Sequence, residues 1–222
     1  MELPMYDTLL SLPLFQGMSQ ADFNSLLQKV RLDFVRFEQG STVIGTGDRC
    51  KSFAFLINGT VESSRDGRNG SFTYMEQIDA PSLIEPYSMF GRAGIYQRTY
   101  VATSQCSFLM VDKQYIYTEL GKYNICRMNL LNMLSGRVQQ LNSHIWDQEA
   151  TNLRGRIIRF IKGLSDLQYG SKKLCIKMND LASLMDATRL NVSRELNALE
   201  AEGLISLRRK EIHIPALERL TI

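Results

Sequence analysis

Between about residue 30 and residue 112, short runs of apolar and β-branched residues alternate with turn residues. The runs are rich in Val, Phe, Tyr and Thr, and Gly, Asn and Asp separate them, which is typical of antiparallel strands joined by tight turns. Ser19, followed by ADFNSLLQKV, predicts a capped amphipathic helix before them. We therefore expect an antiparallel barrel or sandwich with a small helical lead-in. The predicted strands lie within residues 30–37, 41–45, 53–57, 61–65, 71–78, 98–104 and 106–112.

The period then changes to that of a long helix. Apolar residues recur at intervals of three and four, which is the pattern of helices that pair along a seam. We expect a helix from about Tyr123 to Asp147 that pairs with a copy of itself. The alternative is a helix packed against its own β-domain, because the seam lasts only about two heptads. The seam positions are Leu131, Leu134, Val138, Leu141 and Ile145.

The last third of the chain is predicted to hold short helices around a strand. A polar break at residues 147–152 offers Thr151 or Asn152 as a helix cap, and residues 153–164 then form an amphipathic helix. Residues 173–178 predict a short strand. Asn179 is expected to cap a helix over residues 180–186, whose inward side chains are Leu181, Leu184 and Met185.

The next segment, TRLNVSRELNALEAEGLI at residues 188–205, predicts a helix with two different faces. At about 100° per residue, Val192, Leu196 and Leu199 share one side. After it, SLRRKEIHI predicts two short strands around a basic turn. Helix, tight turn, capped second helix and basic hairpin together indicate a winged helix-turn-helix, whose second helix lies in the major groove of DNA.

The second helix and the hairpin carry side chains suited to DNA. Arginine offers two donors to guanine or phosphate, and Ser and Asn reach phosphate or base edges. Leu190 either contacts a thymine methyl or has no function. The expected DNA-binding residues are Asn179, Thr188, Arg189, Leu190, Ser193, Arg194, Asn197, Arg208, Arg209 and Lys210.

The charge distribution agrees with a nucleic-acid partner for this part of the chain. The 222 residues carry a formal net charge of +3. Residues 153–222 hold 13 Lys and Arg against 8 Asp and Glu, so the basic excess belongs to the C-terminal third. Basic side chains of a wing would neutralise phosphates in a way that is independent of sequence and sensitive to salt.

Other features narrow the class of protein. No apolar run approaches the roughly 20 residues that span a bilayer, and the acidic residues near the N-terminus do not match a signal peptide, so we expect a cytoplasmic protein. The four cysteines form no CxxC pair and the two histidines, His144 and His213, are isolated, so we expect no metal and no cofactor. Without a nucleophile–base pair, paired carboxylates or a phosphate loop, we do not expect an enzyme.

Residues 188–205 resemble the recognition helix of the cyclic AMP receptor protein/FNR (Crp/Fnr) family of bacterial transcription regulators, usually T or S followed by R-E-x-V-x-R-x-L-x-x-L-x-x-x-G-L-I. Gly40, Gly47 and Gly59 resemble turns of the family's N-terminal domain, and Gly155 the start of its DNA-binding domain. Leu190 stands where the family usually has a glutamate that reads a cytosine, so the family's common half-site is not implied.

The resemblance implies an α+β chain with three parts. These are a cyclic-nucleotide-binding-like β-roll effector domain over residues 1–122, a dimerisation helix over 123–148 and a winged helix-turn-helix over 149–222. It also implies a homodimer that reads an inverted repeat in double-stranded DNA, and it leaves RNA polymerase open as a further partner. The alternative is a small-molecule sensing module whose winged helix serves protein contacts.

The resemblance also points to an effector site in the β-roll. In the family, an arginine and backbone amides hold the phosphate of a cyclic nucleotide, and a glutamate binds the ribose. Here Ile84 replaces the glycine whose backbone approaches the phosphate, and Pro86 removes an amide donor. The candidate effector residues, matched by type or by position, are Glu85, Arg98, Thr99, Leu141 and Asn142.

The nature of the effector remains open at this point. Leu141 and Asn142 stand where family members have hydroxyl side chains that contact the adenine. Without a nucleotide, Glu85 and Arg98 are expected to be a structural ion pair or surface charges. An iron–sulfur cluster is not expected because no cysteine precedes Cys50. His144 is expected to be structural, with haem ligation as the alternative.

Overall fold

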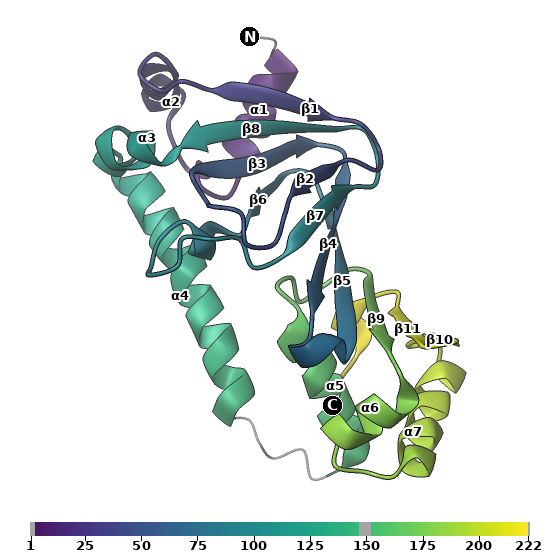
Figure 1. The fold of residues 1–222 in the computed structure, drawn as a ribbon. Coiled ribbons are helices and arrows are strands. Elements are labelled where there is room, and N and C mark those ends of the chain that lie inside the picture. Colours follow the sequence, from purple (N-terminus) through teal and green to yellow (C-terminus); the bar gives the residue numbers. More distant parts are fainter. Residues whose placement is uncertain (1–2, 147–151, 222) are drawn as a thin grey trace. The chain divides into compact units, whose positions relative to one another are not determined.

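The computed structural model describes residues 3–146 and 152–221, without the side chains of residues 3–6 and 143–146, and it divides into two compact units (Figure 1). The first unit comprises residues 1–63 and 78–137, and the second comprises residues 64–77 and 138–222. An internal segment, residues 64–77, thus belongs to the C-terminal unit. The functional boundaries expected after residues 122 and 148 stay predictions.

Antiparallel strands form the body of the first unit and confirm the expected β-rich half. One sheet has the order β1 (Asp33–Phe37), β8 (Cys106–Asp112), β3 (Ser52–Asn58) and β6 (Ser82–Ile84). In addition, β4 (Thr60–Asp66) pairs with β7 (Thr99–Ala102), which pairs with β2 (Thr42–Ile44).

The run FAFLI is apolar throughout because β3 is a central strand covered on both faces. Successive side chains of a strand point to opposite sides of the sheet, and Phe53, Ala54, Phe55 and Leu56 are all buried. On the face of Phe55, the ring of Phe15 stacks at 5.6 Å between centroids. The segment before the strands therefore closes one side of the sheet.

Short helices accompany these strands: α1 (Leu3–Ser11), α2 (Gln20–Leu27) and α3 (Lys113–Thr118). As predicted, Ser19 caps α2, and its Oγ accepts a hydrogen bond from the backbone N–H of Asp22 at 3.1 Å. The sequence did not predict α1, which contains Pro4, or the three-residue strand β6. The short 3₁₀ helices are η1 (Arg68–Gly70), η2 (Pro86–Ser88), η3 (Leu120–Lys122) and η4 (Leu217–Arg219).

The long helix α4 (Asn124–Trp146) forms where the seam predicted it. Its seam side chains Leu131 and Val138 are 55% and 64% exposed, Leu141 is also exposed, and Leu134 is partly buried. Another face attaches the helix to the first unit, since Asn129 Nδ2 donates hydrogen bonds to the carbonyls of Leu14 and Gln16. The seam residues 131, 138 and 141 are therefore available for a partner. The side chain of Ile145 lies outside the described residues.

The described residues of the second unit contain four strands of the seven-stranded sheet to which β4, β7 and β2 also belong, and helices packed with them. The strand order is β5 (Phe72–Asp79), β9 (Lys172–Ile176), β11 (Glu211–Ile214) and β10 (Ser206–Arg208), and β5 lies beside β9 in Figure 1. The helices are α5 (Leu153–Leu164), α6 (Met178–Leu184) and α7 (Arg189–Ala201). Asn152 caps α5, as one of the two predicted candidates, and accepts a hydrogen bond from Gly155 N at 2.8 Å. Thr151 lies outside the described residues.

One apolar core joins the helices and the sheet of this unit. Its buried side chains come from every helix and from β5, β9 and β11, and they include Tyr74, Ile157, Ile161, Leu174, Leu181, Val192, Leu196, Leu199 and Ile212. This arrangement is the expected winged helix-turn-helix, so the chain as a whole has the predicted α+β class. Within the described ranges, no helix combines the length and the apolar character that crossing a membrane requires.

Candidate nucleic-acid interface

The first helix of the helix-turn-helix begins two residues earlier than the sequence predicts. Lys177 occupies the N-cap position of α6, and Asn179 lies inside the helix, so the expected cap at Asn179 is wrong. Strand β9 ends at Ile176, and the chain turns directly into α6, which places Asp180 in the first turn, where a carboxylate favours the helix dipole. Asn179 is exposed.

The inward face of α6 also differs by one residue from the prediction. Leu181, Ala182 and Met185 are buried, whereas Leu184 is 45% exposed. At about 100° per residue, Leu181, Ala182 and Met185 share one side of the helix, and Leu184 lies roughly 100° around the helix from the centre of that side. The core therefore uses a small alanine in place of the expected leucine.

The tight turn between α6 and α7 is set by its own backbone bonds. Asp186 has a φ of 44°, in the left-handed region, and Ala187 N donates to Ala182 O at 3.0 Å. This closure resembles the left-handed ends found at many helix C-termini. Thr188 then caps α7 as predicted, because its Oγ1 accepts a hydrogen bond from Asn191 N at 3.3 Å. The start of α7 is thus fixed in position relative to α6.

The two faces of α7 separate as the sequence predicts. Val192, Leu196 and Leu199 are fully buried in the core. The opposite side is open: Ser193 is partly buried, and the exposed residues at or near the N-terminal half of the helix are Thr188, Arg189, Leu190, Arg194 and Asn197. Leu190 is 69% exposed, so packing within the chain does not explain it.

The hairpin of β10 and β11 forms the basic wing. Arg208 pairs with Glu211, which leaves Arg209 and Lys210 as the two turn residues. Lys210, the second of them, adopts the left-handed conformation, with a φ of 62°. Its carbonyl accepts a hydrogen bond from Ile176 N at 2.9 Å, which ties the turn to the end of β9. All three basic side chains are exposed.

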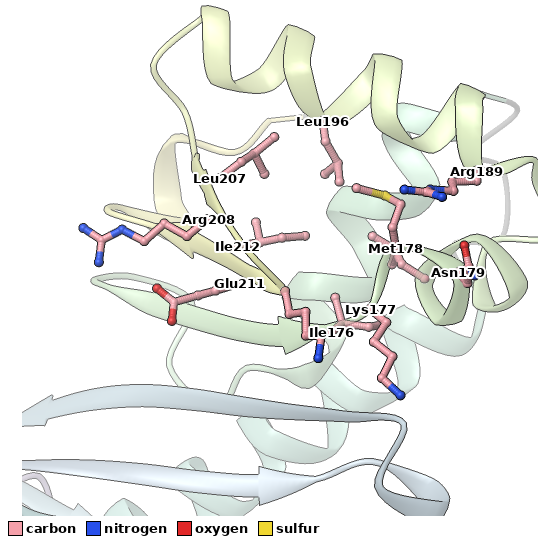
Figure 2. Close-up of a pocket in the computed structure, with 12 residues that line it drawn as sticks. Ile176, Lys177, Met178, Asn179, Arg189, Leu196, Leu207, Arg208, Glu211 and Ile212 are labelled. Atoms are coloured by element: carbon pink, nitrogen blue, oxygen red, sulfur yellow. The ribbon is translucent and has the colours of Figure 1, made fainter.

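A concavity of about 330 Å³ lies between the wing and α7 (Figure 2). Its floor is apolar and includes Ile176, Leu196 and Ile212. Basic side chains line it from the N-terminal end of α6, from α7 and from the β10–β11 hairpin, and the lining includes one acid, Glu211. These basic residues are Lys177, Arg189, Arg208 and Lys210. Lys177 was not predicted as a site residue, because in sequence it is only the polar end of a strand.

Polar contacts behind the interface hold α7 against its neighbours. Arg154 of α5 and Glu202, just after α7, form an ion pair, with Nη2 and Oε2 2.6 Å apart. The contact lowers the pKa of the Glu202 carboxyl and raises the pKa of the Arg154 guanidinium. Glu200 accepts a hydrogen bond from Leu207 N at 2.6 Å and so joins α7 to the first strand of the wing.

Two candidate effector residues of the β-roll, Glu85 and Arg98, are buried. Glu85 and Arg98 are 4% and 1% exposed, so the interpretation of the pair as surface charges is wrong. Glu85 has a φ of 38° and precedes Pro86. Its carboxylate accepts hydrogen bonds from Ser88 Oγ at 2.6 Å, Gln97 N at 2.9 Å and Tyr100 Oη at 2.9 Å. A carboxylate has about four acceptor positions, so the protein itself occupies most of them.

The remaining candidates of that site are Thr99, Leu141 and Asn142. Thr99 Oγ1 bonds Thr46, 3.2 Å from its N and 3.0 Å from its Oγ1, within the first unit. Leu141 and Asn142 are exposed residues of α4 that belong to the second unit. The structure thus brings together the DNA-binding candidates in one unit, whereas it divides the effector candidates between two.

Two family models match the chain. The Crp-like helix-turn-helix domain matches residues 155–221, which contain α5 to α7 and the wing. The cyclic nucleotide-binding domain matches residues 34–123, which contain most of the β-roll.

Known relatives resemble the chain over nearly its whole length. A CRP-like cAMP-activated global transcriptional regulator of Mycobacterium tuberculosis is 25% identical over 222 residues, which cover 93% of this chain and 94% of that protein. The cAMP-activated global transcriptional regulator Vfr of Pseudomonas aeruginosa is 20% identical over 79% of this chain and 86% of its own length. Among solved structures, the catabolite activator protein of Thermus thermophilus matches with a TM-score of 0.54 and 20% identity, covering 94% of this chain and 96% of that one. At that identity, the likeness concerns the fold.

Proposed function

Because the chain belongs to the Crp/Fnr family and is a DNA-binding transcription regulator, we propose that it acts as a homodimer that reads an inverted repeat. Two recognition helices related by a two-fold axis enter successive major grooves about 34 Å apart. The partner that this proposal requires is double-stranded DNA, and RNA polymerase is the further partner of a regulator. As a regulator of this kind, the protein acts in the cytoplasm and catalyses no reaction.

The observation that carries this proposal is the open N-terminal face of α7 beside the wing. Thr188 fixes the start of the helix, and Arg189, Arg194 and Asn197 are exposed on it. These side chains have the donor geometry that reads base edges or holds phosphates. Arg208, Arg209 and Lys210 supply positive charge for the backbone. A surface used only for protein contacts has no need of this concentration of cations around a fixed helix end.

The test is selection of random duplex DNA by the purified full chain at near-physiological salt, with and without cyclic AMP. We expect an enriched inverted repeat. Arg194→Ala should reduce specific affinity by about 1–3 kcal/mol and relax one base position, whereas Arg209→Ala should weaken binding to all sequences alike. Equal losses on selected and random DNA for Arg194→Ala would contradict the role of Arg194.

The same experiment addresses the effector. We propose that the β-roll binds a small molecule near Glu85 and Arg98, and cyclic AMP is the probe because both relatives are described as cAMP-activated. The occupied carboxylate of Glu85 and Pro86 in place of an amide donor argue for a different ligand. Enrichment only with cyclic AMP would overturn that expectation. Enrichment in neither arm would favour the alternative, a sensing module with a protein-binding winged helix.

A further inference from the structure

The tip of the β4–β5 hairpin is part of the same unit as the DNA-reading helix. Residues 64–77 group with the C-terminal unit, and β5 extends its sheet by pairing antiparallel with β9. The register runs from Phe72 opposite Ile176 to Glu76 opposite Lys172. The winged domain thus has a fourth strand that comes from a distant part of the sequence.

This register places the hairpin turn at the same end of the sheet as the wing turn. The start of β5 lies opposite the end of β9, and the end of β9 lies opposite the start of β11, where Cys175 pairs with Glu211. Ile176 N bonds the carbonyl of Lys210 in the wing turn. The turns at residues 67–71 and 209–210 therefore lie at the same end of the sheet. Lys177, which directly follows β9, lies between them at that end.

Buried contacts hold the hairpin tip in this place. Glu76 and Lys172 form an ion pair at 3.4 Å, with both side chains fully buried. The Glu76 carboxylate also accepts the backbone N–H of Asp166 at 3.0 Å. Tyr74 and Ser165 share a hydrogen bond between their hydroxyls. An unmatched buried charge is costly, so this network favours one docked position of the strand over a range of positions.

The tip itself presents positive charge. Arg65 and Arg68 are exposed, and the one acid beside them, Asp66, accepts a hydrogen bond from Thr73 Oγ1 at 2.6 Å. The turn is closed by Gly67 N, which donates to Phe72 O at 2.8 Å. Asn69 is in the left-handed region, with a φ of 56°. The well-defined tip therefore carries two guanidinium groups at the wing end of the sheet, with Arg65 near the end of β4 and Arg68 in the turn.

We propose that the β4–β5 tip is a second basic wing, in which Arg65 and Arg68 bind the phosphate backbone of DNA beside the site read by α7. The inference rests on the proposed DNA-binding function and extends it to residues that lie outside the helix-turn-helix. Since β4 and β5 continue into the β-roll, a change in the β-roll that undocks the hairpin would remove these cations from the DNA surface.

The first test compares Arg65→Ala and Arg68→Ala in the full chain with Arg92→Ala, an exposed arginine of the first unit. Affinity for the selected duplex and for random duplex is measured over a range of salt concentrations. Each hairpin substitution should reduce the slope of log affinity against log salt by about 0.9 for each phosphate that the protein no longer neutralises. The loss of affinity should be alike on both DNAs, because phosphate contacts carry no sequence information. Slopes equal to that of the Arg92 variant would overturn the proposal.

A second test asks whether docking is needed. Tyr74→Phe removes the hydroxyl that bonds Ser165, and Glu76→Gln removes the carboxylate from Lys172. Either substitution should increase amide hydrogen exchange in β5. In a variant with increased exchange, adding Arg68→Ala should reduce DNA affinity less than it does in the unmodified chain. If Arg68→Ala costs the same in the docked and the undocked protein, the second wing is wrong. If the unmodified chain binds no duplex, the proposed function itself has failed, and this outcome is distinct from a failure of the second wing alone.

Discussion

Thr188 controls the start of the recognition helix through a single hydroxyl. Thr188→Ala removes the acceptor of Asn191 N and should lower the free energy of unfolding by about 0.5–2 kcal/mol. Thr188→Ser keeps an acceptor and is the matched control, expected to stay close to the unmodified protein. Urea denaturation followed by circular dichroism measures both variants. Equal stability of the alanine and serine variants would show that the cap contributes nothing.

Leu190 is the residue at which this chain should differ from its relatives in DNA sequence preference. It is 69% exposed, so replacing it should change stability by less than about 0.5 kcal/mol. Leu190→Glu introduces an acceptor that can bond the N4 amino group of cytosine in the major groove. Selection of random duplex should then enrich a cytosine at one position of each half-site. An unchanged selected sequence would mean that Leu190 does not face a base.

At the residue scale, the sequence predicts what periodicity controls and misses what the fold controls. The burial of Val192 and Leu196 follows from spacing alone. The cap at Asn179 is wrong because the end of β9, which no local pattern sets, determines where α6 begins. The burial of Glu85 was not predictable, since a glutamate before proline in a turn is usually solvated, and only the fold brings Ser88, Gln97 and Tyr100 to it.

At the scale of elements, α5 and α7 are joined by an ion pair that predicts a pH effect. The pKa of Glu202 is lowered by Arg154, so the contact stabilises the fold above the ordinary carboxyl pKa. That contribution is lost as pH falls through the lowered pKa of the folded protein. In Arg154→Gln, carbon-13 NMR should show the pKa of Glu202 rising toward its ordinary value. An unchanged titration would mean that the pair does not persist in solution.

Most elements were predictable, but their long-range pairing was not. The run SFTYMEQI gives β5 through its alternation, and the Asp66–Gly70 turn gives its hairpin with β4. Nothing local indicates that Tyr74 and Glu76 meet Ser165 and Lys172, about a hundred positions further on, because alternation identifies the buried face of a strand and not its neighbour. The second wing proposed above depends on this pairing and was therefore outside the reach of the sequence.

At the scale of the whole molecule, the proposed homodimer requires a surface on which two chains meet. Helix α4 packs on its unit through residues such as Asn129, while Leu131 and Val138 stay exposed. Large apolar side chains repeated along one line of an exposed helix are typical of a seam covered by a second copy. The partial burial of Leu134 makes this residue a poor probe, since its replacement would also disturb packing within the chain.

Leu131→Asp and Val138→Asp are the informative changes because they place a charge in the seam without touching the core of a single chain. Both variants should sediment as monomers at concentrations where the unmodified protein is a dimer. Gln139→Asp, an exposed position beside the seam on the same helix, is the control for added charge and should remain dimeric. The monomers should bind a full inverted repeat no more tightly than one half-site, because one chain carries only one α7. A dimer that persists in both seam variants would place the interface on another surface, and tight binding of the repeat by a true monomer would contradict recognition by two paired helices.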